Sequence, residues 1–282
     1  MKKGINRWCL PPAMATEDVF ALASKVGFAG IELNLEEVDP AAPERPETMA
    51  RIGVDASDAA IAELRRQAQR AGLELPSLSS GLFWRYPPTS DDAAIREKAL
   101  VIGERALHLA KLLGANTVLV VPGAVTADVS YAAAYDRARG FLRELAPAAE
   151  RSGVAIGVEN VWNKFLLSPL EFARFLDEVG SAAVGAYLDL GNVLIFGFPH
   201  HWVEILGARI RKIHVKDFRT DVGNRLGFAH LLHGDLDWSR ALAALRQIGY
   251  DDYVTTELSI SKYLVEKTVA DTATSLELIL NL

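Results

Sequence analysis

One pattern recurs about eight times along the chain: a helical stretch, a glycine, a short run rich in β-branched residues, a loop and a new helix. Glycine at a helix end adopts the left-handed conformation at little cost, so these glycines indicate where helices stop. Strands that alternate with helices form a parallel sheet. In chain order, strands are predicted over residues 3–8, 28–34, 73–78, 115–121, 154–159, 184–190, 210–216 and 250–257.

Helix starts are marked as well. Ser168 is followed by Pro169 and, three residues on, by Glu171, which is typical of a capped helix start. We also expect Asp55, Ser90 and Thr16 to cap helices near 56–71, 91–113 and 17–26. Further helices are predicted near 131–151, 199–207, 237–247 and 263–281. No linker-like change in composition divides the chain, which indicates one domain over residues 1–282.

The alternation of side chains along the strands distinguishes an open sheet from a closed barrel. In residues 154–159 one face carries Val, Ile and Val, and the other carries Ala, Gly and Glu159. The same alternation places Asp189, His214 and Glu257 on the inward face of later strands. An open sheet would bury these charges under helices, whereas a barrel brings them to one mouth. The sequence therefore predicts an α/β fold, a single (β/α)8 TIM barrel.

Composition excludes several classes of function. Half of the 282 residues are hydrophobic, which suits a folded domain, and no run approaches the roughly 18 apolar residues of a membrane span. The single cysteine, Cys9, cannot form an internal disulfide, so we expect a reducing, cytoplasmic setting. A net charge of −6 argues against a nucleic-acid partner. No glycine-rich phosphate loop follows a strand, so no nucleotide cofactor is expected.

Four polar residues end four consecutive predicted strands: Glu159, Asp189, His214 and Glu257. Taken singly, each is an ordinary residue of a polar barrel rim. Together, three carboxylates in one dry mouth repel one another, and a cation resolves the conflict. Three oxygens and one imidazole nitrogen suit one divalent metal, with Mn²⁺ as first choice and Mg²⁺ or Co²⁺ as alternatives.

Segments around these residues carry a resemblance: residues 153–160, 187–192, 213–217 and 234–238 read GVAIGVEN, YLDLGN, IHVKD and GDLDW. The chain resembles the sugar isomerase/epimerase family of xylose isomerase-like TIM barrels, which includes ketose 3-epimerases, hydroxypyruvate isomerase and inosose-processing enzymes. The resemblance implies a metal-dependent barrel whose Glu-Asp-His-Glu metal set falls on the same four residues. It also implies that Glu159 and Glu257 form the catalytic pair.

Such a site favours proton transfer next to a carbonyl. A metal bound to the carbonyl and a neighbouring hydroxyl of a sugar would acidify the carbon between them and stabilise an enediolate. If Glu159 and Glu257 flank opposite faces of that carbon, the product is an epimer. A single carboxylate moving the proton between adjacent carbons gives an aldose–ketose isomerase, and loss of water gives an inosose or dehydroshikimate-type dehydratase. The sequence leaves these outcomes open, for a sugar or polyol substrate with or without a phosphate.

Other residues near the mouth are candidate substrate contacts. Glu32 and Lys216 point inward, with a supporting ion pair as the alternative role. The resemblance adds Arg219, close to a substrate-contacting Arg of related epimerases, and Asn192, where ketose 3-epimerases carry His. Aromatic residues of the rim loops can wall the pocket: Trp8, Phe83, Trp84, Tyr86, Trp162 and Phe165. The stretch 217–235 either covers the mouth as a lid or supports a homo-oligomer contact.

Two further classes fit less well. Abasic-site endonucleases on the same barrel use additional histidines, including one at the position of Asn192 and one in an Asp-x-His pair where this chain has Asp235-Leu236-Asp237. The acidic net charge also argues against DNA. A barrel that only binds a sugar has no need of two carboxylates astride one carbon.

Overall fold

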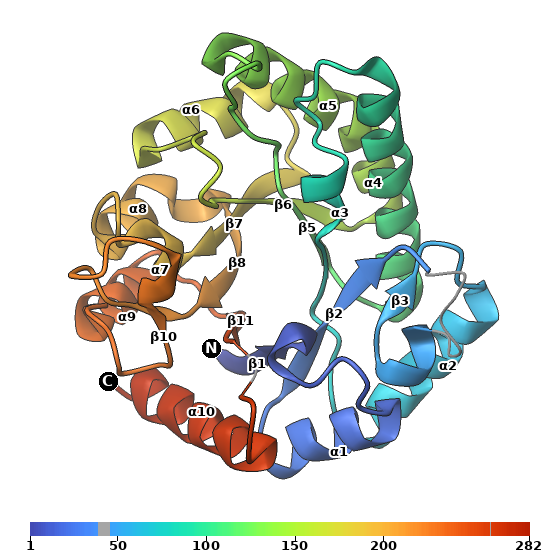
Figure 1. Ribbon diagram of the computed structural model, residues 1–282, viewed down its shortest axis with the longest axis vertical. Coiled ribbons are helices and arrows are strands. Elements are labelled where there is room, and N and C mark those ends of the chain that lie inside the picture. The colour runs from blue at the N-terminus through green and yellow to red at the C-terminus, as the bar shows by residue number, and fades with distance from the viewer. Residues whose placement is uncertain (39–45, 260) are drawn as a thin grey trace.

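The computed structural model describes residues 1–38, 46–259 and 261–282. Within these residues, parallel strands close into an eight-stranded barrel, as predicted, with helices around it (Figure 1). The strands follow the order β1-β11-β8-β7-β6-β5-β4-β2, and pairing of β1 with β2 closes the ring. Their bounds are β1 Lys2–Asn6, β2 Gly30–Glu36, β4 Ser77–Ser80, β5 Thr117–Val120, β6 Ala155–Glu159, β7 Val184–Asp189, β8 Ile210–Val215 and β11 Tyr253–Thr256. The short β3 (Ile52–Gly53) pairs with the end of β2.

The main helices form a ring outside the barrel (Figure 1). They are α1 Thr16–Lys25, α2 Asp58–Arg70, α4 Ala93–Leu113, α5 Tyr131–Ser152, α6 Pro169–Val179, α8 Pro199–Leu206, α9 Trp238–Gln247 and α10 Val265–Leu280. Two single turns, α3 Leu82–Arg85 and α7 Leu190–Val193, follow β4 and β7. None of the helices in the described ranges is long and apolar enough to cross a membrane.

The predicted helix caps are only partly right. Ser168 caps α6 and accepts a hydrogen bond from the Glu171 N–H at 3.2 Å, as predicted. The other three predicted caps, Asp55, Ser90 and Thr16, are wrong. Ser57 and Asp92 cap α2 and α4 instead. In both cases two short polar residues lie two positions apart, and either side chain can cap, so the sequence alone does not choose between them.

The largest error in the strand predictions concerns β4. It was expected over residues 73–78 but spans Ser77–Ser80. Pro76 has no N–H to donate to a ladder, and upstream of it Glu74 makes only an isolated bridge to Gly30. The strand predicted over 250–257 begins at Tyr253. Other strand ends lie within about two residues of their predicted positions, which is normal for boundaries.

The interior of the barrel is polar and tightly connected. Glu32 of β2 accepts hydrogen bonds from the Tyr187 hydroxyl of β7 at 2.5 Å and from the Ser77 hydroxyl of β4 at 2.6 Å. Lower down, the buried Lys212 ammonium donates to Asp252 at 2.5 Å. The Glu32–Tyr187 bond crosses the ring from β2 to β7, whereas the Ser77 and Lys212 bonds link neighbouring strands. Side chains therefore fill the interior of the barrel.

We predict that Gly185→Ala destabilises the barrel. At the register shift between β7 and β8, a Cβ on Gly185 would lie 2.4 Å from the Arg209 carbonyl oxygen and 2.7 Å from Arg211 Cγ. The backbone must shift to relieve this contact, so we expect a loss of about 1–3 kcal/mol in the free energy of unfolding. Urea denaturation measures it. The matched control is Gly140→Ala in α5, where a Cβ meets nothing within 4 Å and a gain of about 0.5–1 kcal/mol is expected; equal midpoints for the two variants would contradict the prediction.

Candidate metal centre

The four predicted ligands meet at the C-terminal ends of four adjacent strands. Glu159 and Asp189 end β6 and β7, His214 lies one residue before the end of β8, and Glu257 directly follows β11. The Glu257 N–H donates to the Val215 carbonyl at 3.0 Å, which continues the strand pairing. One potential ligand atom from each residue lies within 4.8 Å of the others. The predicted convergence of the four side chains is therefore present.

Asp189 is held by the turn that follows its strand. Its N–H donates to Asn160 Oδ1 at 2.7 Å, and its Oδ1 accepts the Asn192 N–H at 2.9 Å. Gly191 leaves no room for a side chain, because a Cβ there would lie 2.5 Å from Lys216 Cγ. One Asp189 oxygen is thus occupied by the backbone, while Oδ2 faces the cluster and the Lys216 ammonium.

His214 is oriented by Glu32 from the opposite side of the barrel. Its Nε2 lies 2.8 Å from Glu32 Oε1, and its Nδ1 lies 3.4 Å from Glu159 Oε1. Since a carboxylate only accepts hydrogen bonds, the His214 Nε2–H donates to Glu32, and this bond directs Nδ1 toward the cluster. Burial acts to raise the pKa of Glu32, but His214 and the surrounding hydroxyls outweigh it and keep that pKa low. Glu32 is fully buried, so it lies behind His214 and not at the surface of the pocket.

The cluster carries unbalanced negative charge. Burial, reinforced by the nearby Glu257 and Asp189 carboxylates, raises the pKa of Glu159 to about 7. Burial acts to lower the pKa of Lys216, yet the surrounding carboxylates raise it, so its ammonium stays charged between Asp189 and Glu257. Three buried or half-buried carboxylates and one imidazole form a donor set that fits a divalent cation.

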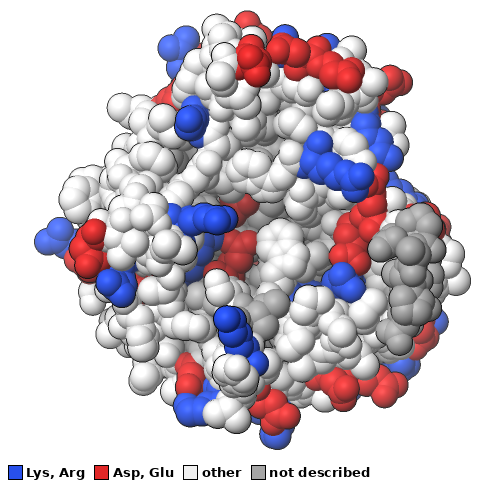
Figure 2. Space-filling model, in the orientation of Figure 1, with Lys and Arg blue, Asp and Glu red and all other residues white. Residues whose placement is uncertain are grey.

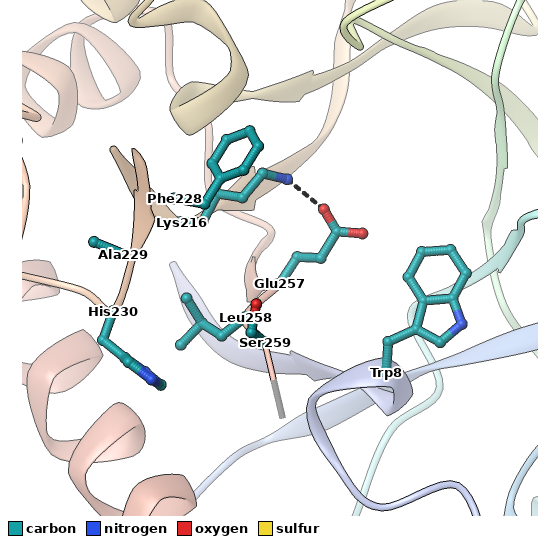
Figure 3. A pocket seen from close by; sticks show the side chains of 8 residues that line it. All are labelled: Trp8, Lys216, Phe228, Ala229, His230, Glu257, Leu258 and Ser259. Atoms are coloured by element: carbon teal, nitrogen blue, oxygen red, sulfur yellow. Dashed lines mark hydrogen bonds and ion pairs between the residues drawn. The ribbon is translucent and has the colours of Figure 1, made fainter. Parts of the chain in front are cut away.

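A pocket of about 480 Å³ lies beside this cluster. Figure 2 shows a hollow in the middle of the face seen in Figure 1, with acidic atoms at its floor and basic atoms next to them. The pocket is lined by Trp8, Lys216, Phe228, Ala229, His230, Glu257, Leu258 and Ser259. In Figure 3 Lys216 runs beside the Phe228 ring toward Glu257, and Trp8 lies on the opposite side. Apolar and charged side chains therefore lie next to each other in the pocket lining.

Four of the five predicted substrate contacts lie outside this lining: Glu32, Asn192, Trp162 and Arg219. The Trp162 ring packs on Phe228 with 4.8 Å between ring centroids, and its Nε1 donates to the Asn192 carbonyl at 3.0 Å. Trp162 thus packs against the side of Phe228 and supports this residue of the pocket lining. Arg219 is exposed and lies 3.5 Å from the Asp221 carboxylate. Of the other rim aromatics, Phe83 and Phe165 are buried against Phe141 and Phe175.

The stretch 217–235 covers part of the mouth. β9 (Asp217–Phe218) pairs antiparallel with β10 (Phe228–Ala229), and β10 lines the pocket. Asp217 is fully buried, and its oxygens accept from the Leu236 N–H at 3.1 Å and Trp238 Nε1 at 3.3 Å. Asp217 therefore anchors this hairpin to the start of α9.

Some residues at the site were not predicted. Asn6 and Ser77 both donate hydrogen bonds to Glu32. Asn6 ends β1 and Ser77 begins β4. The alternation of side chains that identified Glu32 could also have indicated Asn6. Leu258 and Ser259 follow β11, and Ala229 ends the short β10, and no distinctive sequence pattern marks any of them. Their place in the pocket depends on loop paths that the sequence does not specify.

Comparison with known proteins agrees with this geometry. The family model of xylose isomerase-like TIM barrels matches residues 20–281. The 2-epi-5-epi-valiolone 7-phosphate 2-epimerase of Actinoplanes sp. is 29% identical over 222 residues, which cover 78% of this chain and 74% of the relative. The L-ribulose-5-phosphate 3-epimerase of Salmonella typhi is 25% identical over 252 residues, which cover 88% and 83%.

Solved structures show the same fold. A D-psicose 3-epimerase superposes with a TM-score of 0.80 at 19% identity and covers 99% of both chains. The IOLI protein, whose structure holds a zinc atom, superposes with a TM-score of 0.81 at 20% identity and covers 100% of this chain and 98% of its own. With the family match over most of its length and a closed barrel of the same kind, the chain belongs to the xylose isomerase-like TIM barrel family.

Proposed function

We propose that the protein is a divalent-metal-dependent sugar epimerase or isomerase that works through an enediolate. The observation that carries this proposal is the convergence of Glu159, Asp189, His214 and Glu257 beside the pocket. The sugar-phosphate epimerases among the relatives support the same reaction class. Because both act on phosphorylated compounds, the substrates to test include free and phosphorylated ketoses.

The same four residues would hold the metal. When bound, the metal would act as a Lewis acid that stabilises negative charge developing on the substrate oxygens. Mn²⁺ remains the first choice, with Mg²⁺ and Co²⁺ next, and the zinc atom of the IOLI structure adds Zn²⁺ to the ions to compare. Glu32 would act as a positioning residue, since it orients the His214 ring.

Glu159 and Glu257 would carry the proton. Glu257 lines the pocket, whereas Glu159 is 6% exposed and lies deeper, next to His214. Two carboxylates that approach the reacting carbon from different sides can remove a proton from one face and return one to the other. If the substrate carbon lies between the two carboxylates, epimerisation is favoured over single-base isomerisation.

The walls of the pocket suit a sugar. Trp8, Phe228 and Leu258 offer an apolar surface to C–H groups, and Lys216 and Ser259 offer polar atoms to hydroxyls. Asn192 keeps its side-chain oxygen available near Asp189, because its Nδ2 donates to the Asn160 carbonyl at 2.9 Å. Trp162 would affect the substrate only by holding Phe228 in place. Arg219 is exposed and would contact a substrate only from the rim of the pocket.

Metal binding should stabilise the fold. Since an ion that binds only the native state raises its stability, Mn²⁺ added to stripped protein should raise the melting temperature. Loss of a residue that only supports a ligand costs about 10- to 100-fold in metal affinity, so His214→Ala, which removes a proposed ligand, should weaken Mn²⁺ affinity by at least that factor, measured by calorimetry. The matched control is His108→Ala, because His108 is exposed on α4, far along the chain from the cluster, and pairs only with Asp58 at 3.0 Å in the described structure. No melting shift with Mn²⁺, Mg²⁺, Co²⁺ or Zn²⁺ would remove the basis of the proposal.

The two glutamates should separate proton exchange from turnover. Glu159→Gln and Glu257→Gln each keep a carbonyl oxygen but cannot accept a proton, so each should nearly abolish epimerisation, by about 10²-fold or more. One of them should still exchange the substrate proton with heavy water, as NMR would show for a panel of ketoses and their phosphates.

The control for charge removal is Glu266→Gln, on the exposed first turn of α10, with unchanged turnover expected. Exchange and turnover lost together in one variant, with substantial turnover in the other, would indicate a one-base isomerase. A dehydrated product would indicate the lyase. Full turnover in both metal-loaded variants would show that neither carboxylate carries the proton.

A further inference from the structure

The Lys216 ammonium lies inside the predicted metal centre. Its ammonium donates to Asp189 Oδ2 and to Glu257 Oε2, and the side chain is about nine-tenths buried. Both acceptor residues belong to the four whose ligand atoms converge. Lys216 thus binds the same carboxylates that the metal would bind.

The Lys216 ammonium contacts only part of the cluster. Glu159, Asp189 and Glu257 contribute three carboxylates, and Lys216 contacts two of them. A divalent ion between those oxygens would meet the ammonium at short range, where two like charges in a buried site repel strongly. The two cations therefore compete for Asp189 and Glu257.

We infer that Lys216 is a built-in competitor of the metal: it neutralises Asp189 and Glu257 in the metal-free protein and must give up these contacts when the metal binds. The inference rests on the proposed metal site. It deepens that proposal, because it assigns to this chain a group that sets how tightly the metal is held.

The surroundings of Lys216 allow such a movement. Gly191 makes room for the base of its side chain, where a Cβ would lie 2.5 Å from Cγ. The ammonium itself lies 5.2 Å from the centre of the Phe228 ring and borders the pocket. Lysine has a flexible stem and a compact charge, so the tip can turn toward the Phe228 face and the pocket (Figure 3) while the stem stays packed.

The test compares Mn²⁺ affinity in four proteins: wild type, Lys216→Met, Lys216→Arg and Lys262→Met. Each is prepared loaded with Mn²⁺ and titrated with a chelator, so a variant that is unstable without metal still yields a dissociation constant. Lys216→Met should bind Mn²⁺ about tenfold tighter or more, since the competing charge is gone. Lys216→Arg keeps a cation and should bind no tighter than wild type. Lys262→Met removes an exposed charge five residues after Glu257 and should match wild type.

Melting temperatures give a second readout. Without metal, Lys216→Met should melt below wild type, because the carboxylates lose their only close ammonium within the described structure, and its rise on adding Mn²⁺ should be larger. If wild type binds Mn²⁺ and Lys216→Met binds it equally or more weakly, Lys216 does not compete with the metal. The proposed metal site would still stand. A wild type that binds no Mn²⁺ would overturn both.

Discussion

Mutual repulsion among three carboxylates at one mouth is the constraint on which the rest of the site depends. Closing the sheet brings the ends of β6, β7 and β11 together, and with them Glu159, Asp189 and Glu257. Ionised groups in such a place need compensating charge. The protein supplies it from two neighbours, Lys216 and His214. Burial acts to lower both pKa values, but Asp189, Glu257 and Glu159 raise the pKa of Lys216, and Glu32, Glu159 and Glu257 raise that of His214. The charges of these groups therefore depend on one another, and a divalent ion would compensate the carboxylates directly.

The closed ring also explains why the support for His214 comes from so far along the chain. β2 and β8 are not neighbours in the sheet, yet Glu32 reaches His214 across the interior at 2.8 Å. Tyr187 and Ser77 hold the other Glu32 oxygen, so three strands fix the position of one imidazole ring. Side chains held in this way lose little freedom on binding a ligand, which favours a preorganised site.

Much of this arrangement follows from the way in which successive side chains of a strand alternate between its two faces. The inward row of β6 carries Ala155 and Gly157 below Glu159, and inward rows also bring Asp189 and His214 to the strand ends. The barrel and the convergence of the four side chains were therefore predictable, and both are confirmed. The single domain over residues 1–282, the metal and its identity, and the roles of the site residues stay predictions. The sequence did not distinguish between neighbouring residues that could each cap a helix, so Asp55 was predicted where Ser57 caps α2. Loop paths were not either, because they depend on packing between distant segments.

Substrate recognition should then depend on the loops more than on the strands. The side-chain nitrogen of Asn192 is engaged by the Asn160 carbonyl, and its N–H by Asp189, so only one oxygen remains for a ligand at a position where ketose 3-epimerases carry histidine. The β9–β10 hairpin instead brings Phe228 and His230 to the pocket, and Asp217 anchors that hairpin from beneath. Because the hairpin and the proposed metal ligands lie on different elements, changes in Phe228 or His230 would alter the shape of the pocket without disturbing the carboxylates to which the chemistry is assigned here.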